Sequence, residues 1–179
     1  MGRGRSYQAE IFLVSASALL LEISTTRLIS FKLFYYYTYL IIGFAMLGIG
    51  SGGVLVALSE RLRRAPLDRV CATSCLAAAV CIGAGYFLVA LLPFDTSLFW
   101  SSFAEPAKLF AVCLALFAPF ACLGVMIAAL FARRTESIHR LYFADLLGAG
   151  AGCAAVVPLL VVLSPPGCIS VSYTHLTLP

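Results

Sequence analysis

The sequence predicts an all-α integral membrane protein: a bundle of about five transmembrane helices with a cytoplasmic N-terminus. Of its 179 residues, 62% are hydrophobic and only 11% are charged, and the mean hydropathy is +1.02. Soluble domains average about 45–50% apolar and about 25% charged residues. A single core in water cannot hide this much apolar surface, so the lipid bilayer is the expected surroundings and partner of the chain.

Five apolar stretches are long enough to cross a membrane, which takes about 20 largely apolar residues in a helix. They are residues 11–29, 36–58, 70–92, 108–131 and 141–163. None of the connections between them is long enough to form a separate soluble domain. We therefore expect one polytopic transmembrane domain over residues 1–168.

Arginines predict the orientation of this domain. Arg3 and Arg5 precede the first stretch, and further arginines follow the second and fourth stretches: Arg61, Arg63, Arg64, Arg69, Arg133, Arg134 and Arg140. Basic loops stay in the cytoplasm, so the N-terminus is expected inside. Short clusters of this kind set topology, and no nucleic-acid partner is expected. A cleaved secretory signal with Arg3 and Arg5 as its basic region is the alternative. The four further spans favour an uncleaved first helix.

Glycines 48–53, in the segment GIGSGG, fit the pattern G-x-G-x-x-G of a dinucleotide loop, and Asp68 lies where a ribose-binding acid would be expected. That loop needs a strand, a tight turn and a helix, whereas this apolar run is continuous. Gly48 and Gly52 share a helix face, and Gly148 and Gly152 repeat their spacing. Small residues at this spacing indicate close helix packing in membranes.

Three ionisable residues interrupt the apolar stretches: Glu22, Arg27 and Asp145. A charge at the centre of a membrane helix costs about 2.5–3.5 kcal/mol, so each is expected to find a partner or water. Glu22 and Arg27 are about 140° apart around a helix and must look to other helices. Thr25 and Thr26 lie on the side of Glu22. Two interpretations stay open for the three charges: structural locking by buried pairs, or an ion- or substrate-binding cluster.

The chain shows no motif for catalysis, metal or cofactor binding, and none of these is expected. Neither His139 nor His175 lies at ligand spacing from a cysteine pair. Pro119 and Pro158 are expected to kink their helices and to free backbone carbonyls. Six cysteines fall within apolar runs, where cysteine packs as a small hydrophobe: Cys71, Cys75, Cys81, Cys113, Cys122 and Cys153.

Three segments resemble the membrane region of spermidine-synthase-like proteins: LLLEISTTRLIS, the glycine-rich second stretch running into SERLRR, and LYFADLLGAGAG. In bacteria these proteins fuse a major-facilitator-like membrane part to a polyamine aminopropyltransferase domain. The resemblance covers residues 8–167, with Glu22, Arg27 and residues 145–148 as its markers. It implies a non-catalytic domain of the bacterial cytoplasmic membrane that anchors or serves an enzyme domain. Further transmembrane helices of a longer protein are then expected partners.

GGVLVALSERLRR also resembles the glycine-to-basic junction after the second helix of major-facilitator transporters. The alternative is therefore part of a secondary transporter for a small solute, with Glu22, Arg27 and Asp145 along its path.

The last twelve residues, CISVSYTHLTLP, have no relation to the stretches before them. We expect residues 169–179 to be a non-native or disordered tail, typical of sequencing-adapter read-through. A short native external segment is the alternative.

Overall fold

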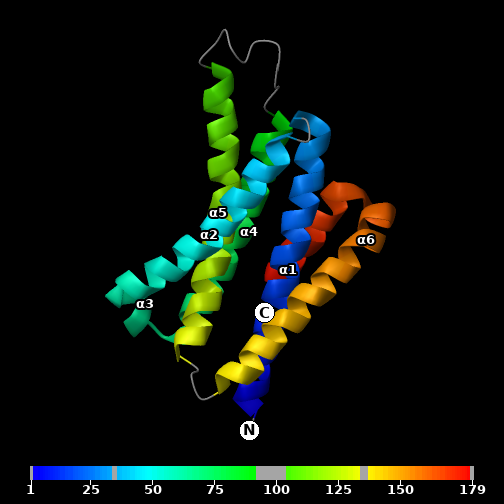
Figure 1. Cartoon of the computed structure of the whole chain (residues 1–179). Coiled ribbons are helices and arrows are strands. Elements are labelled where there is room, and N and C mark those ends of the chain that lie inside the picture. Colours follow the sequence, from blue (N-terminus) through cyan, green and yellow to red (C-terminus); the bar gives the residue numbers. More distant parts are fainter. Residues whose placement is uncertain (1, 34–35, 92–103, 134–136, 178–179) are drawn as a thin grey trace.

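The computed structural model describes residues 2–33, 36–91, 104–133 and 137–177 (Figure 1). It contains six helices: α1 Gly2–Leu33, α2 Tyr36–Leu58, α3 Glu60–Arg64, α4 Leu67–Leu91, α5 Ala104–Arg133 and α6 Ile138–Thr177. No strand occurs in these described ranges. The all-α fold class predicted by the sequence is thus confirmed.

Five of the helices are long and apolar enough to span a membrane. The spans are Tyr7–Ser30, Thr38–Leu58, Leu67–Leu91, Pro106–Arg133 and Ile138–Val162. Each overlaps one of the five predicted stretches. Side chains such as Met46, Val80 and Phe143 lie exposed on the outer surface of the bundle. Such a surface suits lipid, which solvates apolar side chains as well as a protein core does.

Two groups of helices make up the bundle. α1 packs along α6, while α5 lies between α2 and α4 and contacts both. A core of side chains from α1, α4, α5 and α6 joins the two groups, and Ile11, Phe120 and Leu123 are almost completely buried in it. The N-terminus, the end of α5 and the start of α6 lie at the lower end of Figure 1, and α3 lies at the left beside the end of α5, where Arg133 bonds its carbonyl oxygens. The arginines of α3, α4, α5 and α6 in the described chain therefore gather at one end, as the predicted orientation requires.

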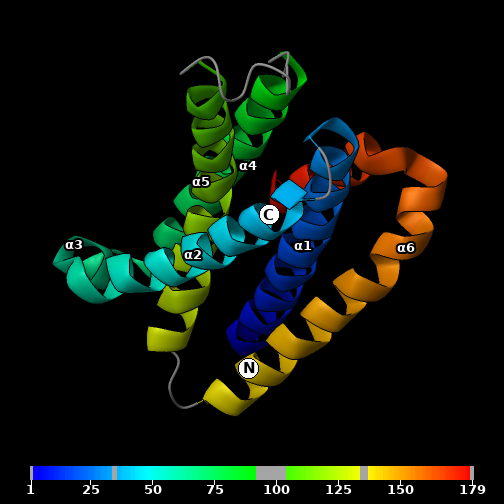
Figure 2. The ribbon, with the colours of Figure 1, turned by 45° about the horizontal axis from the view of Figure 1, so that its top comes forward.

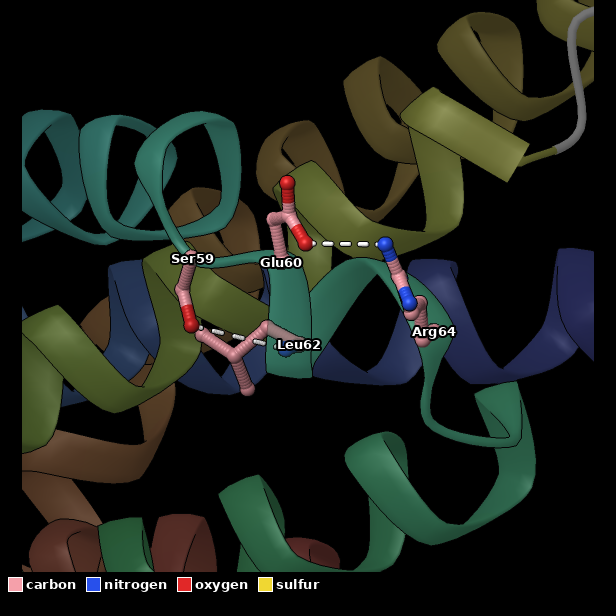
Figure 3. A network of polar contacts seen from close by, with 4 residues as sticks. All are labelled: Ser59, Glu60, Leu62 and Arg64. Carbon is pink, nitrogen blue, oxygen red and sulfur yellow. Dashed lines mark hydrogen bonds and ion pairs between the residues drawn. The ribbon is translucent and has the colours of Figure 1, made fainter.

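The connection between α2 and α4 is built around the short helix α3 (Figure 3). Ser59 caps it, because its hydroxyl accepts a hydrogen bond from the backbone N–H of Leu62. Glu60 and Arg64 form an ion pair of 2.9 Å across one turn. Both side chains are highly exposed, so this pair contributes little stability. Ala65, which precedes a proline, takes the extended conformation that ends the helix.

Helix α6 continues well beyond the predicted span and includes part of the segment that was expected to be a tail. It runs to Thr177 and contains Pro158, Pro165 and Pro166. Figures 1 and 2 show it reversing direction in its orange-red part, so that its last turns come back towards α1 and α4. Proline removes a backbone donor and clashes with the preceding turn, which allows such a reversal.

The returning part of α6 packs against the bundle. Cys168, Ile169, Ser172 and Leu176 are buried, and the Ser172 hydroxyl donates to the Cys168 carbonyl at 3.2 Å. The expectation of a disordered tail over residues 169–179 stays a prediction, while the structure describes residues 169–177 as the last turns of α6. These turns pack on the bundle because one face of this polar segment is apolar. Whether its sequence is native stays a prediction.

Candidate functional site

The polar residues of α1 form the most unusual feature of the membrane-spanning region. Glu22 is only 8% exposed, and Ser15, Ser17, Ser24 and Thr25 are also buried. Glu22 lies fifteen residues after the first and eight before the last residue of its span, Tyr7–Ser30. At a rise of 1.5 Å per residue, it is about 12 Å from the end of the span at Ser30. The carboxyl group is thus placed within the hydrocarbon layer.

Glu22 has no partner within the described part of the chain, where no side chain forms a hydrogen bond or an ion pair with it. Thr25, one of the two threonines expected to solvate it, instead donates its hydroxyl to the Leu21 carbonyl at 2.6 Å. The hydroxyl oxygen of Thr26, one turn after Glu22, is buried and also lacks a partner. Glu22 and Thr26, on neighbouring turns, are therefore left without a bonding partner among the described residues, as is the buried Ser24 hydroxyl between them.

Arg27 does not share the environment of Glu22. Its side chain is exposed, whereas Glu22 is buried, which agrees with their angular separation of about 140° on α1. No described helix covers Arg27, and the expectation that it meets another helix stays a prediction. Arg27 lies one turn before the outer end of its span, so its long side chain can reach the headgroup layer.

Asp145 joins α6 to α1 through a hydrogen bond. The Ser15 hydroxyl donates to Asp145 Oδ1, and both side chains are at least partly buried. Arg140, five residues before Asp145 on α6, is exposed and forms no hydrogen bond with it among the described residues. Ser15 is seven residues before Glu22, a spacing that places both on the same face of α1. The seven-residue spacing from Glu22 is the sequence pattern that could have identified Ser15 as a polar residue facing the bundle interior.

The four glycines singled out in the sequence lie where helix backbones nearly touch. A Cβ atom at Gly48 would lie 2.9 Å from the Phe117 carbonyl oxygen, and one at Gly52 would lie 2.5 Å from that of Ala121. Gly148 and Gly152 face the carbonyl oxygens of Phe12 and Ala16, at 2.3 and 2.5 Å by the same measure. The first pair packs α2 on α5, and the second packs α6 on α1.

The glycine-rich segment of α2 does not form a dinucleotide loop. Residues 48–53 are helical throughout, so the tight turn that this loop requires does not occur. Asp68, the candidate ribose-binding acid, lies in the first turn of α4 and accepts a hydrogen bond of 2.7 Å from the Tyr7 hydroxyl. It ties the start of α4 to the start of α1.

Glycines that the sequence analysis passed over also contribute to these contacts. Gly124 of α5 is the counterpart of Gly52, since a Cβ atom on it would lie 2.4 Å from the Ile49 carbonyl oxygen. Gly85 of α4 faces the Ala115 carbonyl oxygen at 3.3 Å. Pro119, four residues after Ala115, cannot donate to that carbonyl. A glycine that stands alone gives no spacing signal, and its role emerges only from the packed helices.

A small cavity adjoins this freed carbonyl. Its lining includes Thr25 of α1, Gly85 of α4, Pro119 of α5 and Ile169 of α6, and its volume of about 20 Å³ suits a single water molecule. The surrounding side chains are mostly apolar. Because its volume is that of a single water molecule, the cavity is too small for a solute.

The described chain holds no disulfide and no candidate metal site. All seven cysteines are free thiols, and no cluster of histidine, cysteine or acidic residues suited to a metal ion occurs among the described residues.

Comparison of the sequence and structure with protein-family models, curated proteins and solved structures found no match.

Proposed function

We propose that this bundle binds a cationic solute or a proton at Glu22, as part of a secondary transporter for a small solute. The supporting observation is a carboxyl group that is 8% exposed, lies within a membrane span and has no partner in the described chain. Ionisable groups in membrane spans are costly, and those that serve structure alone are paired. An ammonium group or a proton supplies the missing positive charge, and the Thr26 hydroxyl adds a second contact one turn away.

Glu22→Gln keeps the size of the side chain and removes its charge, so it tests this function directly. We expect proteoliposomes with the full chain to take up radiolabelled methylammonium or putrescine above protein-free vesicles. Glu22→Gln should lower uptake at least tenfold, because the amide cannot neutralise a cation. Glu60→Gln is the matched control, since Glu60 is an exposed acid on α3.

A single symmetric peak in size-exclusion chromatography must show that Glu22→Gln assembles. Uptake by the wild type no higher than by empty vesicles, or equal uptake by Glu22→Gln, would contradict the proposal. A variant that loses assembly and uptake together indicates structural locking instead. Arg27→Met, which changes an exposed side chain, is expected to assemble normally. Normal uptake by it would place Arg27 outside the path.

The second candidate is the non-catalytic membrane domain of a spermidine-synthase-like protein. The observation in its favour is that one of the segments with this resemblance, LYFADLLGAGAG, packs on α1. Asp145 accepts a hydrogen bond from Ser15, and Gly148 and Gly152 meet the backbone of α1. Long-read sequencing of the locus tests it. A soluble glycine-rich α/β domain encoded downstream supports this candidate, whereas further apolar spans with nothing soluble after them support the transporter.

A further inference from the structure

A groove between α1 and α6 opens at the cytoplasmic end of the bundle. It is lined by Gln8 and Phe12 of α1 and by His139, Arg140, Phe143 and Leu147 of α6, among others, and its volume is about 630 Å³. This is within the range of about 300–1,000 Å³ that is usual for ligand sites. Just beyond it the two helices touch, where Gly148 meets the Phe12 carbonyl.

The lining changes from polar to apolar along the groove. Gln8, His139 and Arg140 line it near the start of the α6 span, Ile138–Val162, while Phe143 and Leu147 follow one and two turns deeper. From His139 to Leu147 the helix rises about 12 Å, which is the distance from the headgroup layer into the acyl chains. The groove therefore has the polarity profile of a phospholipid rather than that of a soluble metabolite.

Two basic side chains, His139 and Arg140, line the mouth of the groove. His139 and Arg140 are both exposed, and no described acid pairs with the Arg140 guanidinium group. The nearest acid along α6, Asp145, accepts the hydroxyl of Ser15 on α1. Guanidinium groups bind phosphate through charge-assisted hydrogen bonds, and basic pockets between helices on the cytoplasmic side suit anionic lipid headgroups.

We propose that this groove binds an anionic phospholipid of the cytoplasmic leaflet. Arg140 and His139 hold the lipid phosphate, and one acyl chain lies against Phe143 and Leu147. The site is separate from Glu22, which lies on the outer half of α1. It bridges the first and last membrane spans of the described chain, so bound lipid stabilises the α1–α6 pair.

Native mass spectrometry of the full chain, exchanged into equal amounts of phosphatidylglycerol and phosphatidylcholine, tests this site. We expect the wild type to retain phosphatidylglycerol preferentially. The double variant His139→Gln/Arg140→Gln should lose at least five-fold of that preference, and Phe143→Ala should weaken retention without changing the charge. Arg69→Gln is the matched control, because Arg69 is an exposed arginine at the same end and does not line the groove.

The same chain in detergent distinguishes lipid from free phosphate. Phosphatidylglycerol should raise the thermal unfolding midpoint of the wild type but not that of the double variant, and inorganic phosphate should raise neither. An equal rise with inorganic phosphate would assign the groove to a soluble anion and overturn the lipid proposal. Equal retention of both lipids, or unchanged preference in the double variant, would overturn it as well.

Discussion

Replacing Gly52 or Gly152 with alanine is expected to destabilise the bundle, while the same replacement at Gly50 or Gly150 on the same helices is tolerated. A Cβ atom at Gly52 would lie 2.5 Å from both the Ala121 carbonyl oxygen and the Val125 nitrogen. At Gly152 it would lie 2.5 Å from the Ala16 carbonyl oxygen. These are backbone atoms, so relief requires one helix to move away from the other. Gly50 and Gly150 have no atom within 4 Å of the same position.

Alanine should lower the free energy of unfolding at the packed glycines and raise it slightly at the open ones. Alanine in a helix interior is favoured over glycine by about 0.5–1 kcal/mol, because glycine loses more backbone entropy on folding. Overpacking a tight contact costs about 1–3 kcal/mol. The overpacking cost should exceed the gain in helix propensity at Gly52 and Gly152. At Gly50 and Gly150, where nothing is overpacked, only the gain in helix propensity should remain. The double variant Gly52→Ala/Gly152→Ala should show nearly additive losses, since the two glycines belong to different interfaces.

Unfolding of the detergent-solubilised protein by increasing sodium dodecyl sulfate measures these differences. Each variant is compared with the glycine two residues away, so helix, depth and substitution are matched. Equal free energies of unfolding for Gly50→Ala and Gly52→Ala would show that α2 does not pack on α5 through this face. The same result at Gly150 and Gly152 would refute the α1–α6 contact.

The glycine contacts show what spacing in the sequence can and cannot predict. Gly48 and Gly52 are four residues apart, which is enough to place them on one helix face and to predict a close neighbour. It does not say which helix that neighbour is. The contact with α5 depends on Gly124, an isolated glycine whose backbone position is set by packing of the whole bundle. Long-range partners of this kind have no local signal.

The end of the chain carries a helical pattern that its composition does not reveal. The polar and threonine-rich character of residues 169–179 predicted a tail, yet α6 runs to Thr177. Ile169, Ser172 and Leu176 are spaced three and four residues apart and are buried on one face. This is the helical periodicity, which identifies an amphipathic segment even where the average is polar. The five spans were predicted well because length and hydropathy are local properties.

Arg133→Met is expected to release α3 from α5. The guanidinium group of Arg133, in the last turn of α5, donates hydrogen bonds to the carbonyl oxygens of Leu62, Arg63 and Ala65, the one to Arg63 at 2.7 Å. The last carbonyls of a helix have no partner within the helix. A helix of five residues is not stable alone, because its nucleation is unfavourable. Arg133 thus supplies hydrogen-bond donors to the carbonyl oxygens at the end of α3 and holds this helix in place.

Loss of these bonds should cost about 2–3 kcal/mol of local stability. A hydrogen bond to a charged group contributes about 1.5–3 kcal/mol, and water replaces part of this at a half-exposed site. Arg133→Lys should recover only part of the loss, since one ammonium group cannot match the planar fork. Every 1.4 kcal/mol changes an equilibrium tenfold, so α3 should open about 30- to 140-fold more often.

Limited trypsin digestion reports this opening, because α3 contains three arginines: Arg61, Arg63 and Arg64. Cleavage that follows the population of the open form should be at least tenfold faster in Arg133→Met than in the wild type. Glu60→Gln is the control. It removes the exposed ion pair with Arg64 but keeps every cleavage site, and it should change the rate less than twofold. Equal cleavage of wild type and Arg133→Met would mean that α3 is held by its connections to α2 and α4, with the guanidinium group contributing nothing.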